Sequence, residues 1–235
     1  MNGTLYGLGV GPGDPELLTL KAVRLINECP VIAYPAPDTG DSLARAIAAP
    51  YIPDGRHEIV IRTPMVAGNF PAHDVYDHYA NEISTCLKQG KDVAVLCEGD
   101  PFLFGSFMYI FQRLTNEFPA QVIPGVSSVG ACAAAAGAPL VSRNQVLSIL
   151  PAPLPEAVLK ARIMDADAVA IMKVGRHLDK VKRVIHELGL TSGAQYVEHA
   201  TMGNQRVSTL SELTGIKAPY FSMILIRKPE REIAS

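Results

Sequence analysis

A short apolar strand that runs into a glycine- and proline-rich turn is the feature that most constrains this chain. Residues 4–9 favour β structure, and Gly9, Gly11 and Gly13 all fall within positions 9–13. Glycine gives the backbone conformations that other residues reach only with strain, so something must approach this turn closely. Asp14 is placed to cap the following helix and Pro15 suits its first turn. The pattern predicts strand, turn and helix in immediate succession, as in a ligand-binding βα unit.

Two phosphate-binding turns do not fit this segment. The dinucleotide fingerprint, aligned on Gly9 and Gly11, needs its third glycine at position 14, where Asp14 stands. A P-loop needs Gly-Lys-Ser/Thr after the glycines, which is absent, and Pro12 removes one backbone N–H from the turn. We therefore expect a ligand without phosphates, and a purely structural turn is the alternative.

Length and charge limit the partners that this chain can have. Its 235 residues allow one large domain or two of about 100 to 120 residues, and we favour two. A net charge of -2 gives no electrostatic signature for nucleic acid or an anionic membrane. The longest small apolar run, 130–138, is far shorter than the roughly 20 residues that span a bilayer. We expect a small-molecule partner, no nucleic acid and no membrane.

The cysteines and histidines predict neither disulfides nor a metal site. Four cysteines show no paired spacing, and the first residues lack the basic and apolar regions of a signal sequence, so we expect a cytoplasmic protein with reduced thiols. His73 and His78 crowd the start of an expected helix but lie on different faces of it, so no metal is expected. The cysteines are Cys29, Cys86, Cys97 and Cys132.

Strand and helix patterns alternate along the chain and predict an α/β fold with two domains, residues 1–122 and 123–235. The residues after Val93 form a continuous apolar run, which is typical of a parallel strand covered on both faces. Expected strands after the first are 31–34, 58–62, 93–97, 121–123, 146–150, 169–173, 195–199 and 221–227. Expected helices after the first are 42–48, 74–89, 103–114, an alanine-rich segment ending near 137, 156–164 and 177–188.

Three glycine-bearing turns follow strands of the first half, at residues 9–13, 98–101 and 124–128. In an open parallel sheet, ligands gather at the carboxyl ends of the strands. One site could therefore use all three turns.

These three turns resemble the signature segments of the tetrapyrrole methylase family, and the resemblance covers residues 6–226. The segments that carry it are Gly9-Val10-Gly11-Pro12-Gly13-Asp14-Pro15-Glu16-Leu17-Leu18-Thr19, Glu98-Gly99-Asp100-Pro101 and Pro124-Gly125-Val126-Ser127-Ser128. Segments 34–37, 95–102, 105–109, 169–173 and 218–225 are most similar to the branch that methylates precorrin-2 at C20. The resemblance implies two α/β domains with a ligand trough between them, S-adenosylmethionine in the trough, a corrin precursor above it, and a homodimer. S-adenosylmethionine has no phosphate, which agrees with the first turn.

The resemblance also implies a cofactor site. Pro12 would line the cofactor, the Gly99 backbone would pass close to it, and Asp100 would meet a polar group of its methionine or ribose. The remaining wall would be Leu103, Ser127, Ser128, Met172 and Ala200. Ordinary core packing is the alternative for Leu103 and Met172, and helix capping is the alternative for the two serines. Ala200 stands where some relatives carry glycine, and it should be tolerated if its backbone does not need a positive φ.

The implied reaction transfers the sulfonium methyl group to C20 of precorrin-2, giving precorrin-3A in cobalamin biosynthesis, without a metal. Positioning and a dry site would supply most of the catalysis. Glu98, where many relatives carry glycine, or Asp100 could accept the proton that leaves afterwards, and neither is preferred. Alternatives are the cobalt-containing substrate of the anaerobic pathway, another methyltransferase of this fold, and a non-enzymatic sensor. Candidates to bind substrate carboxylates are Arg45, Arg62, Arg143, Lys173, Arg176 and Arg206.

Overall fold

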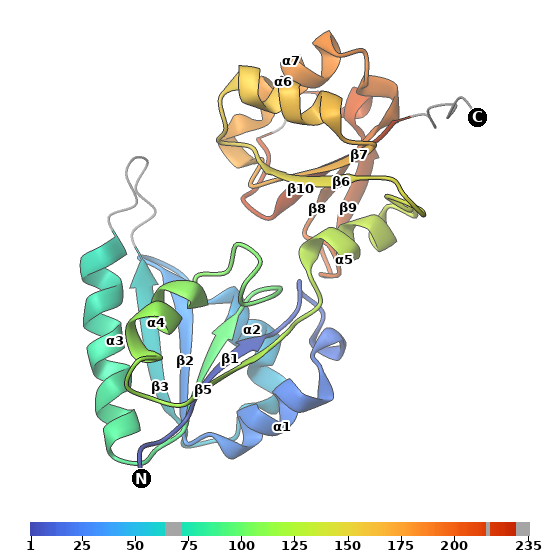
Figure 1. Cartoon of the computed structure of the whole chain (residues 1–235). Coiled ribbons are helices and arrows are strands. Elements are labelled where there is room, and N and C mark those ends of the chain that lie inside the picture. The colour runs from blue at the N-terminus through green and yellow to red at the C-terminus, as the bar shows by residue number, and fades with distance from the viewer. Residues whose placement is uncertain (64–71, 215–216, 229–235) are drawn as a thin grey trace. The chain divides into compact units, whose positions relative to one another are not determined.

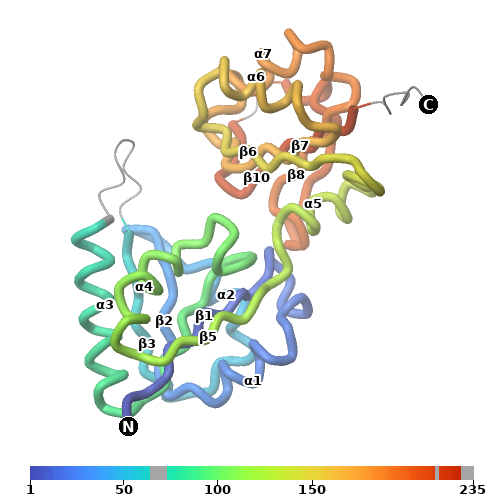
Figure 2. The backbone as a smooth tube through the Cα atoms, viewed as in Figure 1, coloured from blue at the N-terminus to red at the C-terminus, as the bar shows by residue number. Residues whose placement is uncertain are grey.

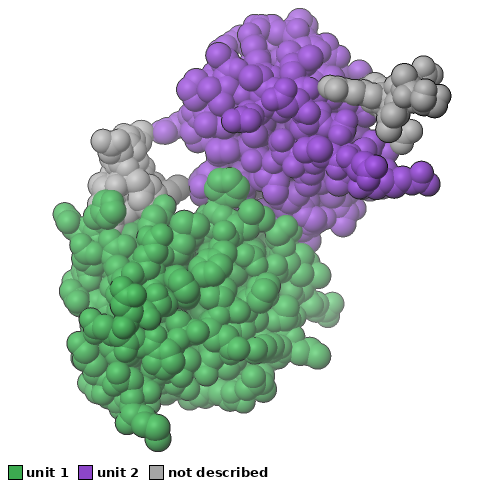
Figure 3. Space-filling view, in the orientation of Figure 1, with its two compact units in different colours: residues 1–127 green, residues 128–235 purple. Residues whose placement is uncertain are grey.

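The computed structural model describes residues 1–63, 72–214 and 217–228 and divides into two compact units, residues 1–127 and 128–235 (Figure 3). The division falls a few residues after the boundary expected from the sequence. Each unit has its own five-stranded sheet with helices packed on it, which confirms the predicted α/β class. Within the three described ranges, no helix combines the length and the apolar character that crossing a bilayer requires.

The first unit is built on a fully parallel sheet in the order β3-β2-β4-β1-β5. The central strand β4 (Val93–Cys97) is buried along its whole length, as its continuous apolar run predicts. The other strands are β1 (Leu5–Gly9), β2 (Val31–Pro37), β3 (His57–Thr63) and β5 (Ala120–Ile123), and the helices are α1 (Leu20–Glu28), α2 (Leu43–Ala48), α3 (Ala72–Lys88) and α4 (Phe107–Leu114).

Helices cover both faces of this sheet (Figure 1). On β4, Val93 and Val95 belong to the core under α3 and α4, whereas Ala94 and Leu96 belong to the core under α1 and α2. This alternation follows from the two-residue period of a strand. Burial on both faces fixes the register of the strand, because a slip by one residue would exchange the two sets.

The chain leaves β1 and β4 in opposite directions. The connection after β1 passes through α1 on one face, and the connection after β4 passes through α4 on the other face and ends in β5. Because β1 and β4 are neighbours in the sheet, their carboxyl ends form a topological switch point. The path of the backbone through this region can be followed in Figure 2. Open α/β sheets bind ligands at such a point.

The second unit has a mixed sheet in the order β6-β7-β10-β8-β9, in which β10 runs antiparallel to both of its neighbours. Helices α6 and α7 cover one face and α5 covers the other (Figure 1). Its strands are β6 (Leu147–Pro151), β7 (Ala168–Met172), β8 (Ala194–Glu198), β9 (Arg206–Thr209) and β10 (Ser222–Arg227), and its helices are α5 (Ser128–Ala135), α6 (Glu156–Asp165) and α7 (Leu178–Glu187).

Two predicted helix starts are wrong. Asp14 caps only the 3-10 helix Pro15–Leu17, through a 2.9 Å hydrogen bond from the Glu16 N–H, and α1 begins later with Thr19 as its N-cap. Similarly, α4 begins at Phe107 rather than at position 103, because the preceding residues form turns. Strand β9 was not predicted. The polar, proline-containing segment 63–73 has the composition of a surface loop, and most of it lies outside the described residues.

Candidate functional site

The turns after β1, β4 and β5 contact one another through their backbones. Gly11 and Gly99 exchange hydrogen bonds, with the Gly99 N–H 2.8 Å from the Gly11 oxygen and the Gly11 N–H 3.3 Å from the Gly99 oxygen. The Val10 N–H adds a 3.0 Å bond to the Cys97 oxygen. The first turn is therefore joined to the second by main-chain bonds that do not depend on side chains.

Glycine is required here because the three backbones lie too close together for a side chain. A Cβ atom on Gly125 would lie 2.1 Å from the Gly99 oxygen and 2.8 Å from the Gly9 Cα. A Cβ atom on Gly9 would lie 2.5 Å from the Gly125 nitrogen. Gly11 needs its freedom for another reason, since its φ is +78°. The glycines of this turn predict that some group approaches the backbone closely. At Gly9, that group is the protein's own backbone.

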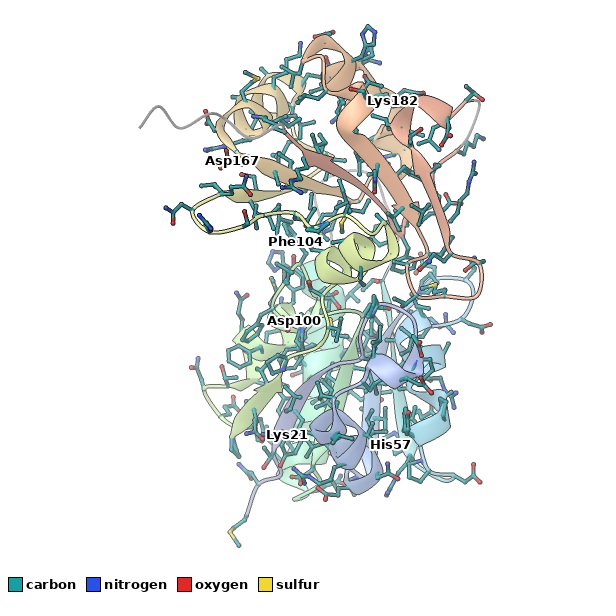
Figure 4. All side chains as sticks on the ribbon, turned by 90° about the vertical axis from the view of Figure 1, so that its right-hand side faces the viewer. Lys21, His57, Asp100, Phe104, Asp167 and Lys182 are labelled. Atoms are coloured by element: carbon teal, nitrogen blue, oxygen red, sulfur yellow. The ribbon has the colours of Figure 1, made fainter. Side chains whose placement is uncertain are left out.

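Asp100 ties the second turn to the third. One carboxylate oxygen accepts a 2.9 Å hydrogen bond from the Phe102 N–H, and the other accepts a 3.1 Å bond from the Gly125 N–H. Hydrogen bonds to a charged acceptor are stronger than neutral ones. Figure 4 shows Asp100 and Phe104 toward the same end of the unit, away from Lys21 and His57. In the structure, Asp100 organises the turns of the switch point.

Glu98 directly follows β4 and is a second carboxyl group at the switch point. Burial raises the pKa of this carboxyl, and hydrogen bonds from the backbone N–H groups of Glu98 and Ala44 oppose the shift. None of the ion pairs in the described part of the chain includes Glu98. A carboxyl with a raised pKa is a better proton acceptor than an ordinary one.

The other predicted site residues of the first unit lie beside these turns. Pro12 follows Gly11 and is partly buried. Leu103 is partly buried in the turn before α4, and it belongs to neither of the two cores of the unit. Ser127 is the last residue of the unit, two residues after Gly125. The structure thus brings Pro12, Gly99, Asp100, Leu103 and Ser127 to the carboxyl edge of one sheet.

The remaining predicted residues lie in the second unit, on the α5 face of its sheet. Ser128 begins α5, Met172 ends β7, and Ala200 follows β8. Ala200 and Met172 belong to the same apolar cluster under α5. Because β7 and β8 both run antiparallel to the intervening β10, their carboxyl ends lie at the same edge of the sheet.

Backbone strain gathers at that edge of the second unit. Lys173 has a φ of +58°, and the two neighbours of Ala200 have φ values of +49° (His199) and +68° (Thr201). Ala200 itself has no positive φ, so the condition for tolerating alanine at this position is met. Burial lowers the pKa of the Lys173 ammonium. Strained non-glycine residues cluster at functional sites more than elsewhere.

Sequence reasoning missed a network beside α2. Arg45 pairs with both carboxylate oxygens of Glu58, at 2.8 and 2.9 Å, and the Tyr34 hydroxyl donates to the same carboxylate at 2.6 Å. Arg45 holds the pKa of Glu58 below its usual range, and burial raises the pKa of Tyr34. Arg62 donates to the carbonyls of residues 37 and 38. Tyr34, Arg45 and Arg62 border a surface cavity of about 470 Å³.

The other predicted cations are scattered over the second unit. Arg143 lies in a loop with a φ of +46°, Arg176 lies in the 3-10 helix Gly175–His177, and Arg206 begins β9. Across the described residues, no group of three His, Cys, Asp or Glu side chains could hold a metal ion.

Comparisons with known proteins agree with this geometry. The family model described as Tetrapyrrole (Corrin/Porphyrin) Methylases matches residues 4–214. The precorrin-2 C(20)-methyltransferase of a Sinorhizobium species is 40% identical over 95% of this chain and 95% of its own length. The cobalt-precorrin-2 C(20)-methyltransferase of Salmonella typhimurium is 32% identical over 97% of this chain and 98% of its own length.

A longer relative matches over part of its length. The cobalamin biosynthesis protein CobIJ of Mycobacterium tuberculosis is 42% identical over 95% of this chain, and the chain spans 46% of that relative. The chain belongs to the tetrapyrrole (corrin/porphyrin) methylase family.

Proposed function

We propose that this chain transfers a methyl group from S-adenosylmethionine to C20 of precorrin-2, giving precorrin-3A. The observation that carries the proposal is the end-to-end similarity to the Sinorhizobium enzyme with that name. The first turn supports it, because a turn that excludes both common phosphate-binding patterns suits a cofactor without phosphates. The switch point of the first sheet is also where a ligand is expected on topological grounds.

In this proposal the cofactor lies against the turns that follow β1, β4 and β5. Pro12 would shape the wall, and the closely packed glycine backbones would let the ligand approach the main chain. Asp100 would act in two ways, by holding the turns together through the Phe102 and Gly125 N–H groups and by accepting a hydrogen bond from a ribose hydroxyl or the ammonium group. Leu103, Ser127, Ser128, Met172 and Ala200 would complete the contacts.

When bound, the cofactor would supply the methyl group from a positively charged sulfur, whose bond to the methyl carbon would be exchanged for the new bond at C20. The residues of the chain orient the two reactants and exclude water, since a dry site does not stabilise the sulfonium charge that disperses during transfer. One proton must then leave C20. Glu98, at the end of β4, is the acceptor in this proposal, because burial raises the pKa of its carboxyl.

We also propose that the protein is a cytoplasmic homodimer. The family resemblance supports the dimer, and Cys29, Cys86, Cys97 and Cys132, all free and buried, suit a reducing compartment. Burial raises the pKa of the Cys97 and Cys132 thiols to about 12, so these thiols stay protonated and unreactive. Size-exclusion chromatography with light scattering at several concentrations tests the dimer.

A methylation assay tests the activity. The protein is mixed with S-adenosylmethionine and precorrin-2, and the product mass is measured together with the position of a labelled methyl carbon. A gain of one methyl group at C20 is expected. Binding of the cofactor without any methyl gain would favour a sensor over an enzyme, and a methyl group on another carbon would favour a different enzyme of this family.

We propose the metal-free tetrapyrrole as the substrate, because the similarity to the Sinorhizobium enzyme exceeds that to the Salmonella enzyme, whose name specifies cobalt. A competition between precorrin-2 and its cobalt complex decides this point. Preferential methylation of the cobalt complex would overturn the metal preference and leave the C20 assignment intact.

A further inference from the structure

The turn that follows Asp100 exposes two phenylalanine rings. Phe102 is 48% exposed and Phe104 is 41% exposed. The Phe102 ring is fixed by two rings of α4, since it stacks on Phe107 with centroids 6.1 Å apart and meets Phe111 edge-on at 5.1 Å. A ring that is held by its neighbours and remains half exposed is preorganised to meet another flat group.

The backbone of Phe104 is strained. Its φ of +57° lies in the left-handed region, where a bulky residue is an outlier and glycine fits without cost. A turn selected only for its shape would carry glycine or asparagine here. The exposed, strained phenylalanine therefore points to a role for the ring itself.

The turn that carries the exposed rings is joined to the proposed cofactor site through the backbone of Phe102. The Phe102 N–H and the Gly125 N–H bind the two oxygens of the same Asp100 carboxylate. Val126, which follows Gly125, is also exposed, at 37%. An apolar surface thus borders the polar contact between the second and third turns. Figure 4 places Phe104 and Asp100 toward the same end of the first unit.

We propose that Phe102 and Phe104 form an aromatic platform that stacks against the conjugated ring of the tetrapyrrole, an inference that rests on the proposed function. A tetrapyrrole is a broad, flat, apolar ring with charged carboxylates on its rim. Aromatic side chains bind such rings by stacking, whereas cations suit only the rim. The platform would set the height and tilt of C20 relative to the methyl group, because the same turn also carries Asp100.

Binding measurements on variants of the full chain test the platform. The probe is sirohydrochlorin, the oxidised and more stable form of precorrin-2, and its fluorescence reports its dissociation constant. Phe102→Leu keeps the apolar volume and removes the flat ring, so about tenfold weaker binding is expected. Phe102→Tyr keeps the ring and should bind within about twofold of the wild type. Val158→Ala, which truncates an exposed apolar residue of α6, is the control.

Phe104→Gly separates the role of the ring from a role in folding. Glycine relieves the strained backbone, so the melting temperature should stay the same or rise while sirohydrochlorin binding weakens by about tenfold. The affinity for S-adenosylmethionine, measured by calorimetry, should be unchanged in Phe102→Leu and in Phe104→Gly.

Three outcomes would overturn the platform. In the first, Phe102→Leu and Phe104→Gly bind sirohydrochlorin as tightly as Val158→Ala does. In the second, these two variants lose affinity for S-adenosylmethionine as much as for sirohydrochlorin. In the third, they become monomeric, which would make the rings a subunit contact. These outcomes are distinct from a failure of the proposed function, in which the wild-type chain itself neither binds sirohydrochlorin nor methylates precorrin-2. That result would overturn both proposals.

Discussion

Replacing Gly125 by alanine tests whether the contact between the three turns holds the switch point together. The new Cβ atom would lie 2.1 Å from the Gly99 oxygen, so one backbone must move by more than about 1 Å to reach an ordinary contact. The three atoms nearest to this Cβ atom are main-chain atoms of Gly99 and Gly9, so no flexible side chain can move aside to make room.

The size of the effect follows from what the movement breaks. Overpacking of this kind costs about 1 to 3 kcal/mol, and loss of the Gly125–Asp100 or Gly11–Gly99 hydrogen bond adds about 1 kcal/mol. We expect the turns to be destabilised by about 2 to 4 kcal/mol, which corresponds to local opening that is roughly 30 to 1000 times more frequent.

Hydrogen exchange followed by mass spectrometry measures this opening. The amides of Val10, Gly11 and Gly99 are hydrogen bonded across the turns and should exchange faster in Gly125→Ala, while the amides of β2 and β3 should keep their protection. Gly203→Ala is the control, because its Cβ atom would meet open space and its backbone has no positive φ. Equal exchange of the three amides in both variants would refute the packing argument.

The remaining predictions concern single side chains of the same site. Asp100→Ala should weaken S-adenosylmethionine binding by about 1 to 3 kcal/mol in calorimetry, and unchanged affinity in a folded variant would exclude its role. Pro12→Phe should abolish methylation while the circular dichroism spectrum stays that of the wild type, and full activity would show that this turn does not face the cofactor. Because the pKa of Glu98 is raised, its ionisation destabilises the fold as the pH rises through that pKa, so Glu98→Gln should resist urea better near neutral pH and show a smaller loss of stability between acidic and neutral pH. If the wild type and Glu98→Gln lose the same stability against urea between acidic and neutral pH, the argument that the pKa of Glu98 is raised by burial is wrong.

Every strand except β9, and the meeting of the three glycine-bearing turns at one edge of the first sheet, could be predicted from sequence because both follow from local patterns. The apolar run of β4 predicts a strand that is buried on both faces, and glycine-bearing turns after strands indicate the edge of the sheet at which ligands bind. The start of α4 could not be predicted, because Leu103 and Phe107 are four residues apart, as on one face of a helix, while Phe104 adopts a left-handed backbone. Nor could the partner of Gly9, since contact with Gly125 depends on the order of strands in the sheet.

The start of α1 at Thr19 is a second feature that could not be predicted from the sequence. Both Asp14 and Thr19 are good N-caps, and the sequence offers no reason to prefer the later one. In the structure the 3-10 helix Pro15–Leu17 comes first, Leu18 is extended, and Thr19 then caps α1. Asp100 was predicted as a ligand contact, and its bonds to the Phe102 and Gly125 N–H groups became visible only in three dimensions.

The main-chain contact between the turns bears on how new specificities could arise on this scaffold. Glycine backbones and one carboxylate hold the three turns in register, through contacts that do not use the side chains of Pro12, Phe102 and Val126. Pro12, Phe102 and Val126 can therefore be exchanged without dismantling the frame that carries them. A randomised library confined to these three positions should yield a high fraction of folded proteins with altered ligand preference, whereas a library that includes Gly9 or Gly125 should yield few.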